Sequence, residues 1–295
     1  MKKIQLVVQS NKLIESRYSL TVGEQRLILA MVARIHPNDE DFFRYEITLR
    51  ELAELMNVDL PYAYHEINRI TERLMERVLH IPQEDGDLLK IHWVSTALHR
   101  KNSVVLSFAP DLKPYLLRLK KEFTKCDLIT VTQFQSIYSI RIYQLLKQYR
   151  KIGHREFRVD ELKEILGLKK TQYSAFKDFR RWVLNQAKKE FEKKDESGKF
   201  RCDLTFSLET FREGRRIARL KFIIIEQEYH ETTPAIQPVI DDKREKEPKP
   251  PESVRDRLIY YGISAGQADG FIKSIGEKDI EEVLTYLPIC SRLEK

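Results

Sequence analysis

The sequence repeats one pattern of elements: an apolar-periodic helix, a short strand, a short helix, a longer helix and two strands. The copies lie within residues 21–108 and 131–225, and sliding one copy by 110 residues aligns them. The matched positions are Leu52 with Leu162, Glu54 with Glu164, Leu55 with Ile165, Met56 with Leu166, and Val58 with Leu168. A chain of 295 residues has room for two such modules and an appendage. The duplication predicts an α+β protein that binds one long partner at two places.

In the first module, residues 21–35 are expected to form a helix and residues 44–47 a strand. Thr48 and Glu51 have capping-box spacing, so the short helix should begin at Leu49. A longer helix should follow from Tyr62, because Pro61 suits a first helical turn. Its apolar stripe consists of Ile67, Ile70, Leu74 and Val78. We expect residues 88–94 and 104–108 to pair as a β-ribbon with a basic tip at 99–102.

The second module should repeat these elements as a helix over 131–150, a strand over 156–159 and a short helix over 160–168. The long helix is expected over 171–194, with an apolar stripe of Phe176, Phe179, Val183, Ala187 and Phe191. Residues 203–208 and 220–225 should form the ribbon. Two short helices followed by a β-ribbon make a winged helix. The sequence therefore predicts tandem winged-helix domains over 1–127 and 128–230.

Residues 231–252 hold five of the eleven prolines with charged residues between them, which indicates a disordered linker. Beyond it, residues 253–295 should form a small all-α module, with short helices at 257–261, 265–275 and 278–287. Such a module would be marginally stable alone. We expect it to be a tethered segment that binds a partner.

The net charge of +7 is concentrated in the second module. Residues 126–230 hold 23 basic and 15 acidic side chains, a net charge of +8, whereas residues 1–125 hold 19 and 17, a net charge of +2. The linker contributes −2 and the tail −1. A localised basic surface implies a polyanionic partner.

The long helix of a winged helix lies in the DNA major groove, and the ribbon touches an adjacent groove or the backbone. On a helical wheel that starts at Phe176, one polar face lies opposite the apolar stripe or on its flank. Residues 169–194 hold nine basic and three acidic side chains, whereas a solvated helix face, the alternative, normally mixes signs. Arginine can read guanine, and lysine mostly neutralises phosphate. The predicted DNA-binding residues are Ser174, Lys177, Arg181, Asn185, Lys188 and Lys189, with Arg212, Arg215 and Arg216 at the ribbon tip.

The corresponding helix of the first module has a mixed face, because Glu66, Glu72 and Glu76 lie among the basic residues. Two tyrosines at its start could contact phosphates or thymine methyl groups. A DNA contact and a plain solvated surface are equal alternatives here. The candidates are Tyr62, Tyr64, His65, Asn68, Arg69, Arg73 and Arg77, with Arg100 and Lys101 at the ribbon tip.

The sequence lacks the spacing of familiar catalytic and metal sites. It has no His-x-x-x-His or His-x-His pair, no phosphate-binding glycine loop and no Gly-x-Ser-x-Gly. We expect no enzymatic activity, no metal and no cofactor. The three cysteines are predicted to be small buried hydrophobic residues, and their number and spacing indicate a reducing compartment; they are Cys126, Cys202 and Cys290. No stretch approaches about 20 apolar residues, so we expect a cytoplasmic protein with no membrane partner.

Two groups of residues carry a family resemblance. Residues 7–13 (VVQSNKL) with 20–27 (LTVGEQRL), and residues 173–184 (YSAFKDFRRWVL) with 187–191 (AKKEF), resemble the iteron-plasmid replication initiators. The resemblance covers about residues 4–226 and excludes the linker and tail. It implies a pseudo-two-fold pair of winged-helix domains, and it makes Arg180 and Arg181 major-groove arginines. The helical wheel disagrees for Arg180, which falls about 40° from Phe176, close to the apolar stripe.

The resemblance implies an initiator of plasmid replication that also controls copy number. Monomers would bind direct repeats (iterons) at the origin, open it and recruit host replication proteins such as a helicase or initiator. Dimers would bind an operator inverted repeat and repress their own gene. The expected partners are therefore double-stranded DNA, a second copy of the chain and host proteins. A two-domain transcriptional repressor with no replication role is the alternative, and a pure protein-interaction module is a third.

Overall fold

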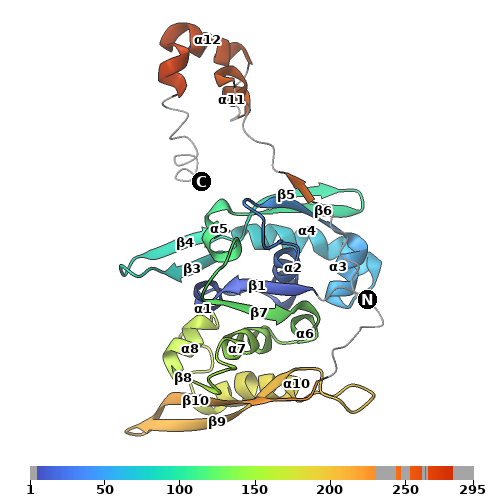
Figure 1. The fold of residues 1–295 in the computed structure, drawn as a ribbon, viewed down its shortest axis with the longest axis vertical. Helices are drawn as coiled ribbons and strands as arrows, with labels where there is room; N and C mark the ends of the chain where they lie inside the picture. The colour runs from blue at the N-terminus through green and yellow to red at the C-terminus, as the bar shows by residue number, and fades with distance from the viewer. Residues whose placement is uncertain (1–4, 230–243, 247–252, 261–262, 264, 282–295) are drawn as a thin grey trace. The chain divides into compact units, whose positions relative to one another are not determined.

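The structure is a computed structural model that describes residues 5–229, 244–246, 253–260, 263 and 265–281. The chain divides into two compact units, Met1–Lys246 and Glu247–Lys295. The first unit contains two winged-helix modules, one after the other along the chain (Figure 1). The tandem arrangement that the repeat predicts is therefore present.

The first module keeps the predicted order of elements after an N-terminal strand. Its short helix begins at Leu49 as predicted, because Thr48 and Glu51 form the expected capping box. Asp59 caps the longer helix, which begins at Leu60 with Pro61 in its first turn. The elements are β1 (Leu6–Ser10), α1 (Asn11–Glu15), α2 (Val22–Val32), β2 (Phe43–Thr48), α3 (Leu49–Met56), α4 (Leu60–Glu76), β3 (Val78–Pro82), β4 (Leu88–His92), β5 (Val94–Arg100), β6 (Ser103–Phe108), the 3-10 helix Pro110–Leu112, α5 (Lys113–Leu116) and β7 (Phe123–Asp127).

The predicted ribbon of this module is wrong in one strand. β6 pairs with β5, with the turn at residues 101–102 inside the predicted tip, whereas β4 pairs with β3 in a separate hairpin. Helix α4 ends at Glu76, before Val78, which had been assigned to its stripe. Leu79 and Ile81 are fully buried and alternate with half-buried or exposed neighbours, so this segment buries apolar side chains with the period of a strand.

The second module contains α6 (Leu128–Thr132), α7 (Ile137–Lys147), β8 (His154–Arg158), α8 (Val159–Ile165), α9 (Phe176–Phe179), the π turn Arg180–Leu184, α10 (Asn185–Phe191), β9 (Leu204–Glu213) and β10 (Arg216–Glu226). The helix predicted over 131–150 is wrong, because α6 and α7 are separate. The break follows from a new helix start, where the Ser136 side chain accepts from the Tyr138 amide and Glu190 accepts from the Gln135 amide at 2.8 Å.

The two modules share an interface built on the N-terminal segment. β1 pairs with β7, and Gln144 of α7 donates to Gln9 at 2.7 Å. Fully buried Arg141 donates to the Tyr18 hydroxyl, to the Ser16 carbonyl at 2.7 Å and to the Ile165 carbonyl at 3.1 Å. One guanidinium therefore joins residues that precede α2 to the end of α8, and it fixes the second module against the first.

The sheets of the first unit are antiparallel. The strand orders are β8–β10–β9 in the second module and β11–β2–β6–β5 in the first. β11 (Arg244–Lys246) pairs with residues 43–45 of β2. It lies within the predicted linker 231–252, whose other residues are outside the described ones.

The second unit holds α11 (Val254–Tyr260) and α12 (Ala265–Ile275). Val254 and Leu258 pack with Ala268 and Ile280 in a small apolar cluster, and Arg255 pairs with Asp269 at 2.6 Å. The first two predicted tail helices are therefore present. Most of the third, predicted over 278–287, lies outside the described residues.

Candidate nucleic-acid interface

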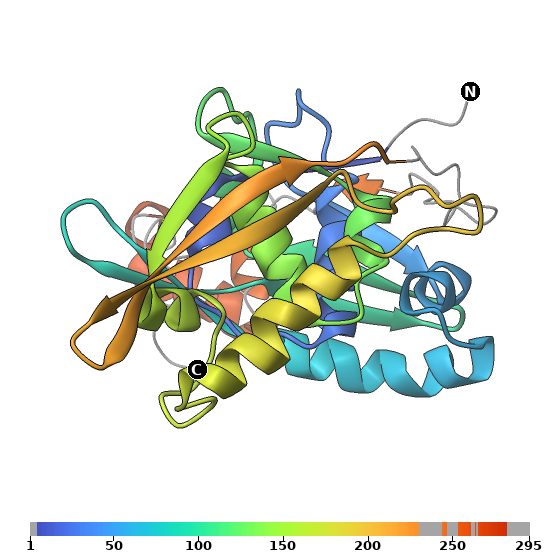
Figure 2. The same cartoon turned by 90° about the horizontal axis from the view of Figure 1, so that it is seen from below.

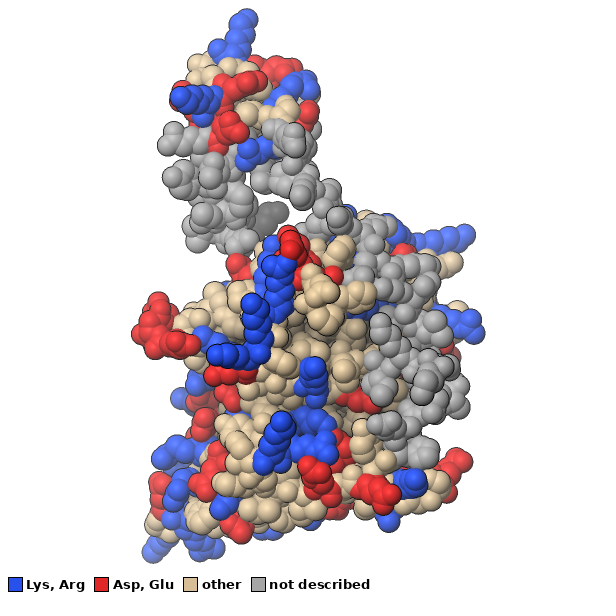
Figure 3. All heavy atoms as spheres, in the orientation of Figure 1, with Lys and Arg blue, Asp and Glu red and all other residues tan. Residues whose placement is uncertain are grey.

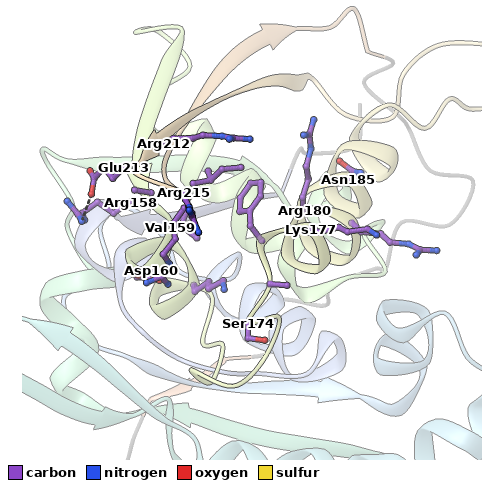
Figure 4. Close-up of a pocket in the computed structure, with 17 residues that line it drawn as sticks. Arg158, Val159, Asp160, Ser174, Lys177, Arg180, Asn185, Arg212, Glu213 and Arg215 are labelled. Atoms are coloured by element: carbon purple, nitrogen blue, oxygen red, sulfur yellow. Dashed lines mark ion pairs between the residues drawn. The ribbon is translucent and has the colours of Figure 1, made fainter.

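An open groove of about 880 Å³ lies between the α9–α10 helix and the β9–β10 hairpin of the second module. Figure 4 shows Arg212 extending from the hairpin toward the helix that carries Arg180. Seven of the nine residues predicted in this module line the groove, together with Arg180. The full lining is Arg158, Val159, Asp160, Lys163, Ser174, Ala175, Phe176, Lys177, Arg180, Arg181, Asn185, Arg212, Glu213, Arg215, Arg216, Ile217 and Ala218.

The helix beside the groove begins later than predicted, at Phe176 instead of Thr171. Tyr173 has a left-handed backbone with φ of 48°, which a helix cannot contain. Lys163 of α8 donates to the Tyr173 carbonyl at 2.7 Å and holds this loop. Burial lowers the pKa of Lys163, although the nearby Asp160 raises it and Arg216 lowers it again. Ser174 therefore reaches the groove from a loop.

The direction of Arg180 follows from the π turn. The Asn185 amide bonds to the Arg180 carbonyl, five residues back, so this turn holds one residue more than an α-helical turn. One extra residue shifts the phase of the helix by about 100°. Arg180 is exposed and lines the groove. Half-buried Phe176 lines it as well, so the wheel was wrong to take Phe176 as part of a buried stripe.

The groove has a strong excess of positive charge. Eight of its lining residues are basic, and two, Asp160 and Glu213, are acidic. Glu213 pairs with Arg158 at 3.6 Å, which Figure 4 marks. Two carboxylates of the helix are used elsewhere: Glu190 accepts from the Gln135 amide, and Glu192 accepts from the Thr205 hydroxyl at 3.1 Å. A solvated helix face would carry both positive and negative side chains, but the groove side of this helix carries only positive ones.

The hairpin presents its arginines through a tight turn. Gly214 has φ of 63°, a conformation that glycine adopts without strain, and it joins β9 to β10. Arg212, Arg215 and Arg216 are exposed. In Figure 3, Lys and Arg side chains gather at this end of the hairpin, at the lower left. The basic tip thus lies where a winged helix meets the DNA backbone.

Two predicted residues of the helix lie outside the groove. Lys188 is half-buried and pairs with Glu192 at 3.7 Å, one turn farther along the helix. Lys189 is exposed but is not among the lining residues. Arg158 and Lys163 line the groove and were missed, because their local sequence predicts only a strand end and a helix face. The matching of α8 with α3, which packs beside α4, could have pointed to Lys163.

The first module presents its candidates on α4. Tyr62 and Tyr64 are 50% and 58% exposed, and His65, Asn68 and Arg73 are exposed as well. The positive charge of this face is partly neutralised. Arg69 pairs with Glu66, Arg77 bonds to Glu24 at 3.1 Å, and Arg100 of the ribbon lies 3.4 Å from Glu46. Lys101 is exposed at the tip of that ribbon.

Helix α4 and the N-terminal part of the α9–α10 helix lie toward the same side of the first unit, as Figure 2 shows from below. A smaller hollow of about 580 Å³ lies beside the start of α4, lined by Arg50, Ala53, Glu54, Asn57, Val58 and Leu60. One basic and one acidic residue line it. The two modules therefore differ in charge where they correspond in fold.

Within the described ranges, no three His, Cys, Asp or Glu side chains gather as a metal site. No helix in the described part of the chain is long and apolar enough to cross a membrane. The buried cysteines Cys126 and Cys202 are unpaired thiols, as predicted, and burial raises the pKa of both. Cys290 lies outside the described residues.

Comparisons with known proteins match both modules separately. The family model described as Initiator Replication protein, WH1 matches residues 6–147, and the one described as Initiator Rep protein, WH2 matches residues 158–224. A curated replication initiation protein from Escherichia coli is 35% identical over 196 residues, 63% of this chain and 61% of that protein. The curated PI protein from Escherichia coli is 31% identical over 160 residues, 49% of this chain and 50% of that protein.

The chain thus spans about half to three fifths of the length of these two curated relatives. Among solved structures, a Pi initiator protein in complex with iteron DNA is similar with a TM-score of 0.60 and 21% identity. The match covers 77% of this chain and 100% of that chain. At this identity the likeness establishes the shared fold.

Proposed function

The chain belongs to the initiator replication protein family, with WH1 and WH2 domains in one polypeptide, and from this premise we propose that it initiates plasmid replication. It binds repeated sequences (iterons) at the origin as a monomer. It represses its own gene as a dimer on an inverted repeat. These roles act through double-stranded DNA, a second copy and host replication proteins such as a helicase or initiator.

The groove between the α9–α10 helix and the basic hairpin carries this proposal. Three of its eight basic side chains, Lys177, Arg180 and Arg181, lie on the helix itself, and the exposed face of that helix also carries Asn185. These side chains can reach base edges in a major groove while the hairpin arginines contact phosphates. The similar Pi initiator was solved with iteron DNA, which supports a DNA-binding role for the shared fold.

The second module is the main DNA anchor in this proposal, and the first contributes a weaker contact. The charge difference of the two modules, +8 against +2, supports that division. The first module is then free to supply the surface for self-association and for the host proteins. The protein acts without chemistry, metal or cofactor of its own, in the cytoplasm where plasmid DNA is copied.

Binding to DNA can be tested by its dependence on salt. If about six of the groove cations neutralise phosphates, the slope of log K against log salt should be about −5. Fluorescence anisotropy with a labelled duplex between 50 and 300 mM salt measures it. A pure protein-interaction module would show no salt-dependent binding, and that outcome would refute the proposal.

Replication itself separates the initiator from a repressor with the same fold. The gene is inserted with its flanking repeats into a vector without an origin, and transformants are counted. Autonomous replication that depends on the gene supports the initiator. Binding to the repeats and repression of a reporter without replication would favour the two-domain repressor instead.

A further inference from the structure

An exposed tryptophan occupies the middle of the π turn beside the groove. Trp182 is 54% exposed, and it is absent both from the apolar core and from the groove lining. Its ring lies under the guanidinium of Arg181, whose central carbon is 4.8 Å from the ring centroid. The indole is therefore exposed to solvent next to an arginine that lines the groove.

The packing of the helix accounts for the extra residue at this point. Phe179 is buried before the turn, Val183 and Leu184 are buried within it, and Ala187 and Phe191 are buried after it. On a regular α-helix Leu184 would lie about 140° from Phe179, whereas in a π turn residues five apart lie on the same face. Arg180, Arg181 and Trp182 then form three consecutive exposed positions.

The partner of Arg181 is therefore its own neighbour in the chain, because its guanidinium lies over the Trp182 ring. A guanidinium stacked on an indole loses part of its rotational freedom and keeps its donor edge available. A guanidinium that is already ordered before binding loses less side-chain entropy when its N–H donors bond to a base.

We propose that Trp182 is a positioning residue that holds the Arg181 guanidinium on the groove side of the helix and thereby sets base discrimination at the position that Arg181 reads. This inference rests on the proposed function, because it requires that Arg181 contacts DNA. Trp182 itself makes no base contact in this arrangement.

The test uses a duplex selected from random sequence by the full-length wild-type protein. Affinities are measured for that duplex, for each of its single base-pair variants and for a random duplex, at several salt concentrations. The proteins are wild type, Trp182→Ala, Trp182→Phe, Arg181→Ala and the double variant Trp182→Ala/Arg181→Ala. Phe211→Ala is the matched control, because Phe211 is also exposed beside an arginine (Arg219, 5.4 Å), and Arg219, unlike Arg181, lies outside the groove lining.

Trp182→Ala should reduce discrimination at one base pair by about two- to fivefold, the strength of an exposed cation–π contact. Its affinity for random DNA and its salt slope should not change. Trp182→Phe should restore most of the discrimination, and Phe211→Ala should leave it intact. In the Arg181→Ala background, Trp182→Ala should have no further effect, because its action passes through Arg181.

Three results would overturn the inference. Unchanged discrimination in Trp182→Ala would show that the stacked ring has no role. An equal loss on selected and random duplexes would make Trp182 a non-specific contact. Additive losses in the double variant would mean that Trp182 acts on DNA without Arg181. If the wild-type protein selects no sequence at all, the proposed function fails instead, and the two failures are thereby distinguished.

Discussion

Replacing Gly167 by alanine should loosen the two winged-helix domains from each other. Gly167 follows α8 with φ of 70°, and a Cβ there would lie 2.2 Å from the Tyr18 carbonyl oxygen and 2.8 Å from its carbon. The left-handed backbone alone costs a non-glycine residue about 1–2 kcal/mol. The loss of glycine entropy in the unfolded chain offsets about 0.4–1 kcal/mol of this.

The clash adds a second, larger cost. Tyr18 cannot simply move away, because Arg141 holds its hydroxyl and the Ser16 carbonyl, and Arg17 pairs with Glu164 at 2.8 Å. Losing one hydrogen bond of the buried Arg141 guanidinium costs about 1.5–3 kcal/mol. We therefore expect Gly167→Ala to lower the free energy of unfolding by about 3 kcal/mol in total.

Gly153→Ala is the matched control. Gly153 has φ of 82°, and a Cβ there meets nothing within 4 Å, so it isolates the backbone strain at about 1 kcal/mol. Urea unfolding, followed by circular dichroism and by tryptophan fluorescence, measures both variants. If the two substitutions destabilise the protein equally, the close approach of Gly167 to Tyr18 does not support the domain interface.

The other predictions concern the groove, the carboxylate of Glu190 and the buried thiol of Cys126. Arg181→Ala should weaken binding to the selected duplex by about 1–3 kcal/mol and relax one base position, whereas Lys177→Ala should weaken all duplexes alike and shallow the salt slope by about one. Equal effects of both changes on selected and random DNA would reject the α9–α10 helix as the reading element. Glu190→Ala should lower the free energy of unfolding by about 1 kcal/mol, because its carboxylate caps the start of α7; unchanged urea unfolding would contradict that role. Burial raises the pKa of Cys126 to about 12. The contribution of this thiol to the free energy of unfolding should therefore be fully present below about pH 8.5, the pKa of an exposed thiol, and should be lost as pH rises from there toward 12. Urea unfolding of a Cys290→Ser variant across this range measures the decline, to which buried Cys202 contributes in the same direction. Constant stability up to pH 11 would contradict the burial of both thiols.

Much of the fold could be predicted because it depends on short-range patterns. The capping box at Thr48 and Glu51 placed the start of α3 correctly, and the apolar stripes identified α4 and the α9–α10 helix. The groove residues of the second module could also be predicted in large part. Charge and apolar periodicity are local properties, so they assign a helix face without knowledge of its neighbours.

The errors occurred where distant residues decide the local structure. The segment after α4 is too short for its period to separate a helix end from a strand, and its pairing with β4 depends on a hairpin partner. The start of α9 depends on Lys163, because its side chain donates to the carbonyl of Tyr173, ten residues farther along the chain. Neither contact leaves a signal in the adjacent sequence.

The sequence by itself determined that this chain has two related modules, and that the second carries the positive charge. It could not determine where Arg180 points. The π turn lets Phe179 and Leu184, five residues apart, face the same core, and that core is assembled from α7, β9 and β10 as well. Tertiary packing therefore decided the phase of the helix, and with it which arginines face the groove.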